Sequence, residues 1–347
     1  MTGAEPSRVL CLGPVGIDIV MEGYAPTDPE RLSTWAGPVE MRMLAAGSIG
    51  YVALALLGLG RAVALSSTVG DDHLGAELLR QLTAASVDTS DIEVAAGPTS
   101  VAAYLRMFGD AKRPMVFRAG GYAPWPASDR VIRAIDEHRP AAIVISGLLH
   151  YPEYAAAQLG AVAAHARSLG LPVIVDPQFP PRRRSRPWAD DLAELLGSTS
   201  VLCCDELEGD HLFGSSDVDE IIAAGQRHGI ATVVVKREHL GSVIDDGRSR
   251  LYQTAISLGA GVGSTIGSGD AFLAGLVDAL LDADSTTSLI ARATATASVA
   301  ITAPDGIRGV TAVEARRWRS LVAAPHELRP HERAAEHADR TRNGEAS

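Results

Sequence analysis

Short apolar runs rich in β-branched residues alternate with helical patterns through the second half of the chain. Four of these runs fit a buried strand: 143–145, 173–175, 201–203 and 233–235. Three stretches of helical periodicity accompany them: 129–138, 153–169 and 218–228. Continuously apolar strands that alternate with helices are typical of a parallel sheet covered on both faces. The pattern therefore predicts an α/β fold with a mainly parallel central sheet.

The first third of the chain adds further strands and helices. Residues 8–13 and 62–68 are predicted strands. The helix predicted at 48–59 is apolar on nearly every side, so we expect it to be buried. Asp71 or Asp72 can cap another helix, which runs to about residue 86.

Two segments break this rhythm. Residues 21–43 contain three prolines and mixed polarity, and residues 98–120 include two alternating runs, 101–108 and 115–118. These two runs are predicted to pair as strands about a turn at Gly109-Asp110.

The last third combines a hairpin, two helices and a polar end. Residues 243–244 and 251–252 are expected to form an antiparallel hairpin. Helices are predicted at 271–281 and 311–322. Residues 324–347 are mostly polar, charged and aperiodic, and we expect them to be disordered.

Composition and charge argue against several classes of protein. With 347 residues, 46% of them hydrophobic, the chain can bury a large core and fits one large or two small domains. A net charge of −11 argues against nucleic acid or an anionic membrane as the main partner. No apolar run reaches the roughly 18 residues of a membrane helix, and the N-terminal residues lack the basic start of a signal peptide. Cys11, Cys203 and Cys204 lie in apolar runs without metal-ligand spacing, so we expect core cysteines in a cytoplasmic protein.

The most informative stretch is 265–272, Thr-Ile-Gly-Ser-Gly-Asp-Ala-Phe, which opens the helix predicted at 271–281. Its two glycines allow a tight turn that presents N–H groups at the positive end of a helix, and this is an anion site made of main chain. Asp270 has an ordinary explanation as a residue that compensates the helix dipole. It also has a chemical one, because a fixed base beside an anion site is what phosphoryl transfer to a hydroxyl requires.

This stretch resembles the second signature of the ribokinase-like (PfkB) carbohydrate kinases, D-T-x-G-A-G-D-x-F. Five positions are kept in register: Thr265, Gly267, Gly269, Asp270 and Phe272. The resemblance implies a ribokinase-like three-layer sandwich with a small β lid from about 21–43 and 98–120, in one kinase domain over residues 1–323. It also implies an enzyme that uses ATP and Mg²⁺ to phosphorylate a hydroxyl of a sugar or related polyol.

The same resemblance implies catalytic roles at the helix start. Asp270 would take the proton of the attacking hydroxyl, a role worth roughly 10²- to 10⁴-fold in rate. The N–H groups of Gly267, Ser268 and Gly269 would stabilise the charge that builds on the transferred group. The lid would exclude water from the site.

Three residues near the N-terminus match the family's acceptor site. Asp18 follows the first predicted strand, where the family has a sugar-binding aspartate, although aspartates are also common in turns. The segment 46–53 resembles the first signature, G-G-x-x-x-N-x-A. Gly47 is kept, and Tyr51 replaces the asparagine that binds substrate. Close helix packing could equally explain Gly47, and Tyr51 could instead be a core residue.

Asp205 and Glu208 resemble the family's N-x-x-E segment, in which the glutamate orders water around Mg²⁺. Acidic residues also favour the first turn of an ordinary solvated helix. Residues 176–178, Asp-Pro-Gln, resemble a D-P-N segment that precedes a mobile arginine loop in some sugar-acid kinases. An acidic or phosphorylated acceptor therefore stays open.

The nucleotide side of the family's site is matched at scattered positions. Lys236 and Gly241 resemble a K-x-G-x-x-G segment over the nucleotide, with Glu238 in the place of its first glycine. Thr265 belongs to the second signature. Thr294 stands where the family has an asparagine beside the adenine, and a plain buried helix is the favoured explanation there.

Other functions are less well supported. Neither lysine, Lys112 or Lys236, follows a glycine, so there is no P-loop, and there is no G-x-S-x-G or H-E-x-x-H motif. A nucleoside kinase of the same fold is the nearest alternative, since Tyr51 could stack against a base. A ligand-binding or regulatory protein on a degraded kinase fold is another, which the retained loop and base argue against. We expect a homodimer, because the lid strands offer sheet edges that need covering.

Overall fold

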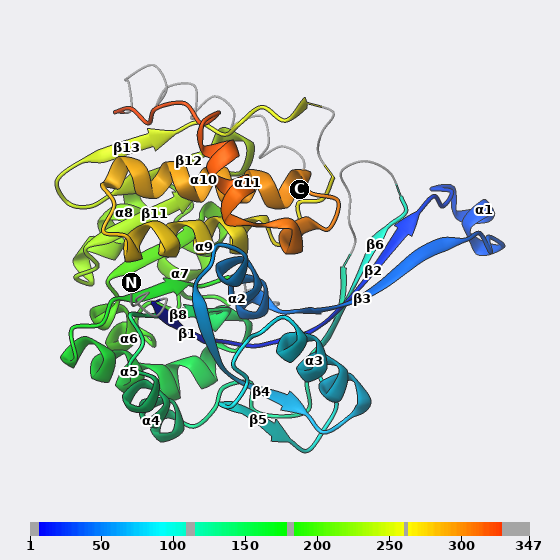
Figure 1. Ribbon diagram of the computed structural model, residues 1–347, viewed down its shortest axis with the longest axis horizontal. Helices are drawn as coiled ribbons and strands as arrows, with labels where there is room; N and C mark the ends of the chain where they lie inside the picture. The colour runs from blue at the N-terminus through cyan, green and yellow to red at the C-terminus, as the bar shows by residue number, and fades with distance from the viewer. Residues whose placement is uncertain (1–6, 109–114, 179–183, 260–262, 328–347) are drawn as a thin grey trace, which may run out of the picture.

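The central sheet runs through the body of the protein in a computed structural model that describes residues 7–108, 115–178, 184–259 and 263–327 (Figure 1). Within those residues it has nine strands: β1 (Arg8–Leu12), β4 (Ala62–Gly70), β5 (Ile92–Ala95), β8 (Ala142–Ser146), β9 (Val173–Asp176), β10 (Val201–Asp205), β11 (Thr232–Lys236), β12 (Ser242–Asp245) and β13 (Arg250–Gln253). Their order is β13-β12-β11-β10-β9-β8-β1-β4-β5, and every neighbouring pair from β11 to β5 is parallel. This confirms the predicted mainly parallel sheet, with the antiparallel hairpin of β12 and β13 at one edge. The other edge, β5, was not predicted from the sequence.

Helices cover both faces of this sheet and make a three-layer sandwich. One face is covered by α2 (Ser48–Gly58), α3 (His73–Ala84), α9 (Ser268–Leu281) and α10 (Thr286–Thr302). The other is covered by α4 (Ser128–His138), α5 (Pro152–Ser168), α6 (Ala193–Ser198), α7 (Glu206–Phe213) and α8 (Val218–Arg227). Helix α11 (Ala312–Arg319) packs on α10.

Side chains of the parallel strands alternate between two hydrophobic cores. In β10, Cys203 packs into the core on the side of α2, α9 and α10. Its neighbours Leu202 and Cys204 pack into the core on the side of α4, α5 and α8. The period of two along a strand produces this alternation when both faces are covered. Burial raises the pKa of Cys203 and Cys204, so both thiols stay protonated in the core.

A second sheet projects from one side of the sandwich as a lid (Figure 1). Its strands lie in the order β3 (Val39–Ala46), β2 (Gly16–Gly23), β6 (Val101–Arg106) and β7 (Met115–Arg118), and the short helix α1 (Pro29–Ser33) connects β2 to β3. Only the β2–β6 pair is parallel. The predicted pairing of 101–108 with 115–118 is confirmed, whereas the predicted turn at Gly109-Asp110 lies outside the described residues.

The lid strands extend beyond the expected segment 21–43. Strand β2 begins at Gly16, so Asp18 lies on a lid strand rather than in a turn after β1. Asp18 and Glu22 interrupt an otherwise apolar run, and this polarity hides the strand in the sequence. Both residues lie on the same face of β2 because they are an even number of positions apart.

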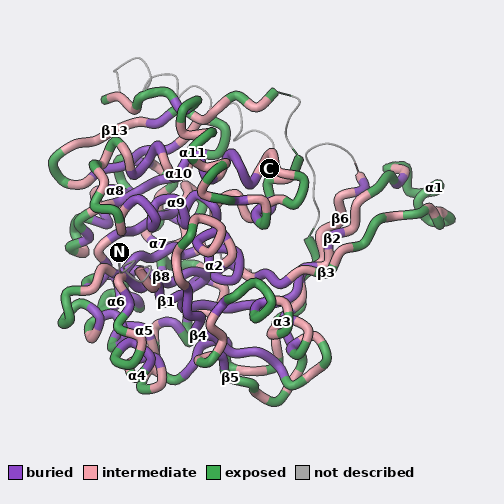
Figure 2. Tube along the Cα trace, in the orientation of Figure 1, coloured by how far each residue is buried: buried purple, intermediate pink, exposed green. Residues whose placement is uncertain are grey.

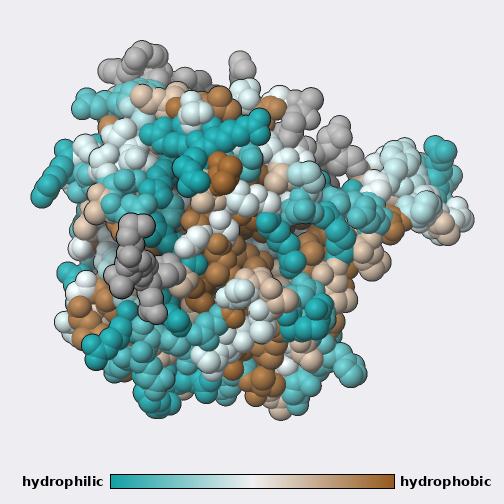
Figure 3. All heavy atoms as spheres, in the orientation of Figure 1, coloured by the Kyte–Doolittle hydropathy of each residue, from teal (hydrophilic) through white to brown (hydrophobic). Residues whose placement is uncertain are grey.

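Burial follows these layers. Figure 2 shows buried positions along the central strands and exposed positions at α1 and the outer part of the lid. On the face drawn in Figure 3, apolar atoms gather near the centre, over α2, with hydrophilic atoms around them. None of the helices in the described parts of the chain is long and apolar enough to cross a membrane.

The described chain ends beside the edge strand β13. His326 forms a β-bridge with Tyr252, through hydrogen bonds of 2.7 and 3.0 Å between their backbone groups. The rest of the segment that we expected to be disordered, residues 328–347, lies outside the described residues.

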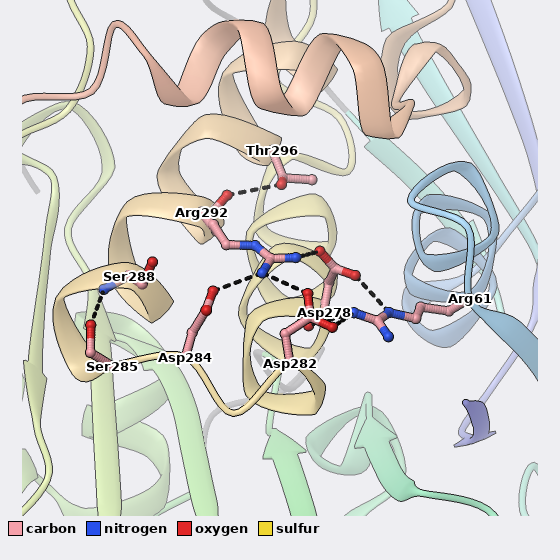
Figure 4. A network of polar contacts seen from close by, with 8 residues as sticks. All are labelled: Arg61, Asp278, Asp282, Asp284, Ser285, Ser288, Arg292 and Thr296. Carbon is pink, nitrogen blue, oxygen red and sulfur yellow. Dashed lines mark hydrogen bonds and ion pairs between the residues drawn. The ribbon is translucent and has the colours of Figure 1, made fainter. Parts of the chain in front are cut away.

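An ion-pair network joins α9 to its neighbours (Figure 4). Arg61, which follows α2, donates from Nε to Asp278 Oδ1 at 2.7 Å and from Nη2 to Asp282 Oδ1 at 2.6 Å. From α10, Arg292 pairs with Asp278 and Asp282, and with Asp284 at 2.7 Å. The network therefore fixes the C-terminal half of the helix that carries Asp270 at its other end.

Candidate active site

The glycine-rich turn forms the start of α9, three residues earlier than the sequence predicts. Gly267 is the N-cap, with φ of 76°, a left-handed conformation that suits glycine. A Cβ atom there would lie 3.2 Å from Cδ1 of Ile307. The N–H of Ser268 already donates to the carbonyl of Thr265 at 3.2 Å. Among the described residues, the N–H groups of Gly267 and Gly269 have no acceptor, so these two can bind an anion.

Asp270 is buried in the first turn of α9 but does not cap its own helix. Its Oδ1 accepts a hydrogen bond from Nε2 of Gln178 at 3.1 Å. Burial raises the pKa of Asp270 well above its usual value; Asp176 and Asp18 raise it further, and Lys236 opposes the shift. A carboxyl group with a raised pKa is a stronger proton acceptor once ionised, as a general base requires.

A cavity of about 330 Å³ lies between the lid and the body of the protein. Four of the predicted site residues line it: Asp18, Gly47, Tyr51 and Asp270. They come from β2, the turn before α2, α2 itself and the start of α9. Much of the remaining lining is large and apolar or aromatic, notably Tyr104, Met115, Phe117 and Tyr151. The structure thus brings the proposed base and the proposed acceptor-binding residues to one cavity.

Asp18 and Tyr51 form a hydrogen-bonded pair in this cavity. The Tyr51 hydroxyl donates to Asp18 Oδ2 at 2.5 Å. Burial raises the pKa of Asp18 to about 7, although the bond from Tyr51 lowers it. Because Tyr51 occupies one carboxylate oxygen, the other oxygen is left to accept a hydroxyl of a ligand.

Gly47 has a packing role as well as a place in the cavity wall. Its φ is 88°, and a Cβ atom there would lie 2.7 Å from the carbonyl oxygen of Pro14 and from Cα of Val15. This geometry supports the packing explanation for Gly47, whereas a role in ligand binding stays a prediction for a residue that also lines the cavity.

A buried charge cluster lies at the carboxyl ends of β9, β10 and β11, where ligands of open α/β sheets bind. Lys236 Nζ lies 3.0 Å from Asp176 Oδ2 and 3.4 Å from Glu208 Oε2. Burial alone would lower the pKa of Lys236, but the two carboxylates raise it well above its usual value. A Cβ atom on Gly269 would lie 3.7 Å from this ammonium. The lysine therefore places a fixed positive charge beside the glycine-rich turn.

Asp205 and Glu208 form a capping box at the start of α7. Each accepts the other's backbone N–H, at 2.7 Å in both cases. Glu208 is buried, with 3% of its surface exposed, so this is not the solvated helix start that was the alternative explanation. Its Oε2 both caps the helix and contacts Lys236.

The remaining predicted nucleotide positions differ in their geometry. Gly241 has φ of 109°, and a Cβ atom there would lie 2.0 Å from the carbonyl oxygen of Gln253, so close backbone packing requires glycine. Glu238, in the place of a family glycine, has a left-handed φ of 49°. Thr265 is exposed beside the turn. The Thr294 hydroxyl donates to the carbonyl of Ile290 at 2.9 Å within α10, as the explanation of a plain buried helix expects.

Sequence reasoning noted residues 176–178 only for their resemblance to a D-P-N segment and did not include Asp176 or Gln178 among the site residues. Asp176 is the last residue of the buried strand β9 and Gln178 lies two residues beyond it, at the sheet edge where the other site residues gather. Position at the carboxyl end of a predicted parallel strand was the signal that could have found them.

The fold agrees with those of solved sugar kinases. Ribokinase from Arabidopsis thaliana, complexed with ribose and ATP, is 21% identical, with a TM-score of 0.73 over 91% of this chain and 99% of that chain. A putative ribokinase II from E. coli, in complex with ATP and Mg²⁺, is 19% identical, with a TM-score of 0.74 over 91% of this chain and 99% of that chain. A fructokinase from Xylella fastidiosa with bound ATP is 17% identical, with a TM-score of 0.73 over 90% and 98% of the two chains. These similarities confirm the ribokinase-like fold class.

The family model for pfkB family carbohydrate kinases matches residues 17–312. The match includes the lid, the central sheet and the turn that contains Asp270. The chain therefore belongs to the pfkB family of carbohydrate kinases.

Proposed function

We propose that the protein is an ATP-dependent kinase that transfers the γ-phosphoryl group to a hydroxyl of a sugar or related polyol. The observation that carries this proposal is the position of Asp270, which lines the cavity and directly follows Gly269, whose N–H has no acceptor among the described residues. A base and an anion site within one helical turn are what this transfer requires. Membership of the family and the likeness to ribokinase and fructokinase support it.

In the proposed reaction, the acceptor hydroxyl lies between Asp18 and Asp270. Asp270 takes its proton as the hydroxyl oxygen bonds to the γ-phosphorus and the bond to the β-phosphate oxygen breaks, so ADP leaves. The N–H groups of Gly267 and Gly269 donate to the transferred group, and one such donor is worth about 10²- to 10³-fold in rate. Ser268 contributes less, because its N–H already has an acceptor.

The nucleotide would extend from this turn past Lys236, Gly241 and Thr265. Lys236 is the best supported of these contacts, since its charge is fixed beside Gly269. Thr294 remains a proposed contact, but its hydroxyl is already used within α10.

Mg²⁺, when bound with the nucleotide, would offset the charge of its phosphates. Glu208 would support its water shell indirectly, through water, and Asp205 would contact the nucleotide. The described parts of the chain contain no group of three or more His, Cys, Asp or Glu residues suited to hold a metal directly. This fits Mg²⁺, which keeps several waters and is bound largely by substrate phosphates.

A nucleoside kinase is the second candidate, favoured by the aromatic lining of the cavity. Tyr104, Phe117 and Tyr151 offer faces on which a base could stack. No lysine or arginine is among the described residues of the lining, and burial lowers the pKa of His150 to about 4, which leaves it neutral. Both features disfavour an acidic or phosphorylated acceptor.

Release of ADP from ATP, measured across a panel of sugars, sugar acids and nucleosides, tests the proposal. We expect turnover with a neutral sugar, polyol or nucleoside, and its loss in Asp270→Asn. The exposed aspartate Asp129 offers a matched control, since Asp129→Asn changes the same group far from the cavity. ADP release that does not depend on any acceptor, or that survives in Asp270→Asn, would contradict the proposal.

A further inference from the structure

The backbone of Gln178 is unusual for its residue type. Its φ is 57°, in the left-handed region that few residues other than glycine and asparagine adopt. The surrounding segment holds it there, because Leu149 N–H donates to the carbonyl of Pro177 at 2.9 Å and Gln178 N–H donates to Asp176 Oδ1 at 3.3 Å. Backbone conformations of this kind are concentrated at functional sites. The conformation therefore calls for a functional explanation of the side chain.

That side chain reaches across the site to the start of α9. Its Nε2 donates to Asp270 Oδ1 at 3.1 Å, although the two residues are 92 positions apart in the chain. No other side chain among the described residues donates to the Asp270 carboxylate. Gln178 and Asp270 both line the acceptor cavity. The hydrogen bond therefore lies in the wall of the cavity, where the orientation of Asp270 matters most.

A single donor on one oxygen gives the carboxylate a defined direction. With Oδ1 held by Gln178, Oδ2 is the oxygen left for the acceptor hydroxyl. An amide suits this task because it orients the carboxylate without neutralising it, whereas an arginine or lysine would weaken it as a base. We infer that Gln178 is a positioning residue for Asp270, and this inference rests on the proposed role of Asp270 as the base.

The charges that face Asp270 show what loss of this bond would do. From β9 and β2, Asp176 and Asp18 raise its pKa, and from β11, Lys236 lowers it. Tyr51, on α2, is neutral because burial and Asp18 raise its own pKa. The bond from Gln178 lowers the pKa of Asp270. Removal of this bond should therefore raise the pKa of Asp270. The acid limb of the kcat profile, the pH range in which kcat rises as Asp270 ionises, should then move to higher pH.

Gln178→Met tests the inference, because methionine has a similar length but no donor. We expect kcat to fall by roughly 10- to 100-fold, as for a misplaced reacting group, while KM for ATP changes less than twofold. Gln178→Asn is the second variant, since asparagine tolerates the left-handed backbone but its amide is one methylene too short. We expect it to lose activity as Gln178→Met does.

Gln226→Met is the matched control. Gln226 Nε2 donates to Asp245 Oδ1 at 2.9 Å, a bond of the same kind between α8 and β12 and outside the cavity. Its loss should leave kcat and the acid limb unchanged. An unchanged acid limb in both Gln178 variants, or a loss of kcat no larger than in Gln226→Met, would overturn the inference.

A measurement without turnover separates this inference from the proposed function. The side-chain carboxyl ¹³C signal of Asp270, assigned with Asp270→Asn, can be titrated in the unmodified protein and in Gln178→Met. A shift of its midpoint to higher pH supports the contact, and an unchanged midpoint overturns it, whatever the activity. If no acceptor supports ADP release from the unmodified protein, the proposed function fails while this titration still decides the role of Gln178.

Discussion

Lys236 Nζ lies 3.0 Å from Asp176 Oδ2, and both side chains are almost completely shielded from solvent. Glu208 adds a second carboxylate at 3.4 Å, so one lysine holds two buried acids. Breaking a buried pair by removal of one partner leaves an uncompensated charge, which is more costly than the pair itself is worth. The positive charge of Lys236, which lies beside the glycine-rich turn, therefore also contributes to the stability of the sheet.

Lys236→Met should destabilise the protein and weaken ATP binding. The expected loss in the free energy of unfolding is about 3–5 kcal/mol at neutral pH. It should shrink at acid pH, because Asp176 and Glu208 can then bind protons, and burial already raises the pKa of both. Urea denaturation at several pH values measures this. Arg80→Met, which breaks an exposed pair with Glu77, is the control and should leave the midpoint nearly unchanged. An equal loss in both variants would refute the prediction.

Asp270→Asn should lower turnover by at least about 10²-fold without weakening ATP binding. The melting temperature near neutral pH should stay the same or rise. The sign follows from linkage: the pKa of Asp270 is raised in the folded state, so its ionisation costs stability as the pH rises from about 4. ADP release and thermal melts measure the two effects. Turnover within a few-fold of the unmodified protein would exclude Asp270 as the base.

Arg61→Met should lower the free energy of unfolding without changing the lining of the cavity. Arg61 and Asp278 are both largely buried, with 14% and 9% of their side chains exposed. Arg292 still pairs with Asp278 in the variant, so we expect a loss of about 1.5–3 kcal/mol, the value of hydrogen bonds to a charged group. Arg133→Met breaks only an exposed helical pair and serves as the control. Equal denaturation midpoints for the two variants would show that the network contributes nothing.

Local chemistry explains what the sequence predicts well. Short apolar runs rich in β-branched residues favour strands covered on both faces, so residues 143–145 or 233–235 indicate the parallel sheet without any knowledge of their partners. The two glycines at 267 and 269 fix a turn before an apolar helix in the same way. The fold class therefore follows from patterns that are each complete within a few residues.

Contacts between distant segments explain what the sequence does not predict. The bond from Gln178 to Asp270 and the pair of Lys236 with Asp176 join different strands and helices, and no local pattern records them. Strand β2 was also missed, because Asp18, which lines the cavity, and Glu22 interrupt its apolar run. The polar side chain of Asp18 was thus one reason that its strand went unrecognised.

The protein is expected to form a homodimer through the outer face of the lid. Cross-strand pairing places Met41 beside Met21 on the outer face of the lid sheet, which points away from the cavity. Met43 and Val116 lie on the same face. Met41 and Val116 are 60% and 62% exposed. In a chain of net charge −11, a mainly apolar face without acidic residues is where two copies can approach without repulsion.

Sedimentation at micromolar concentration tests the dimer. We expect a species of twice the chain mass, and its dissociation in the double variant Met41→Lys with Val116→Lys. Leu321→Lys changes another exposed apolar residue, outside the lid, and should leave the dimer intact. A single species near 36.3 kDa for the unmodified protein would reject the prediction.

Acceptor affinity should fall as the pH drops below about 7, the pKa to which burial raises Asp18. Protonation removes the negative charge from the oxygen that accepts the ligand hydroxyl. Calorimetry of acceptor binding in the Asp270→Asn background isolates this effect, because the other titrating carboxyl of the cavity is then absent. Tyr51→Phe removes the hydrogen bond that lowers the pKa of Asp18, so the midpoint should move to higher pH. Tyr24→Phe, at a lid tyrosine that is 80% exposed, is the control and should not move it. A midpoint that Tyr51→Phe leaves in place would mean that the Tyr51 hydroxyl does not control the charge of Asp18.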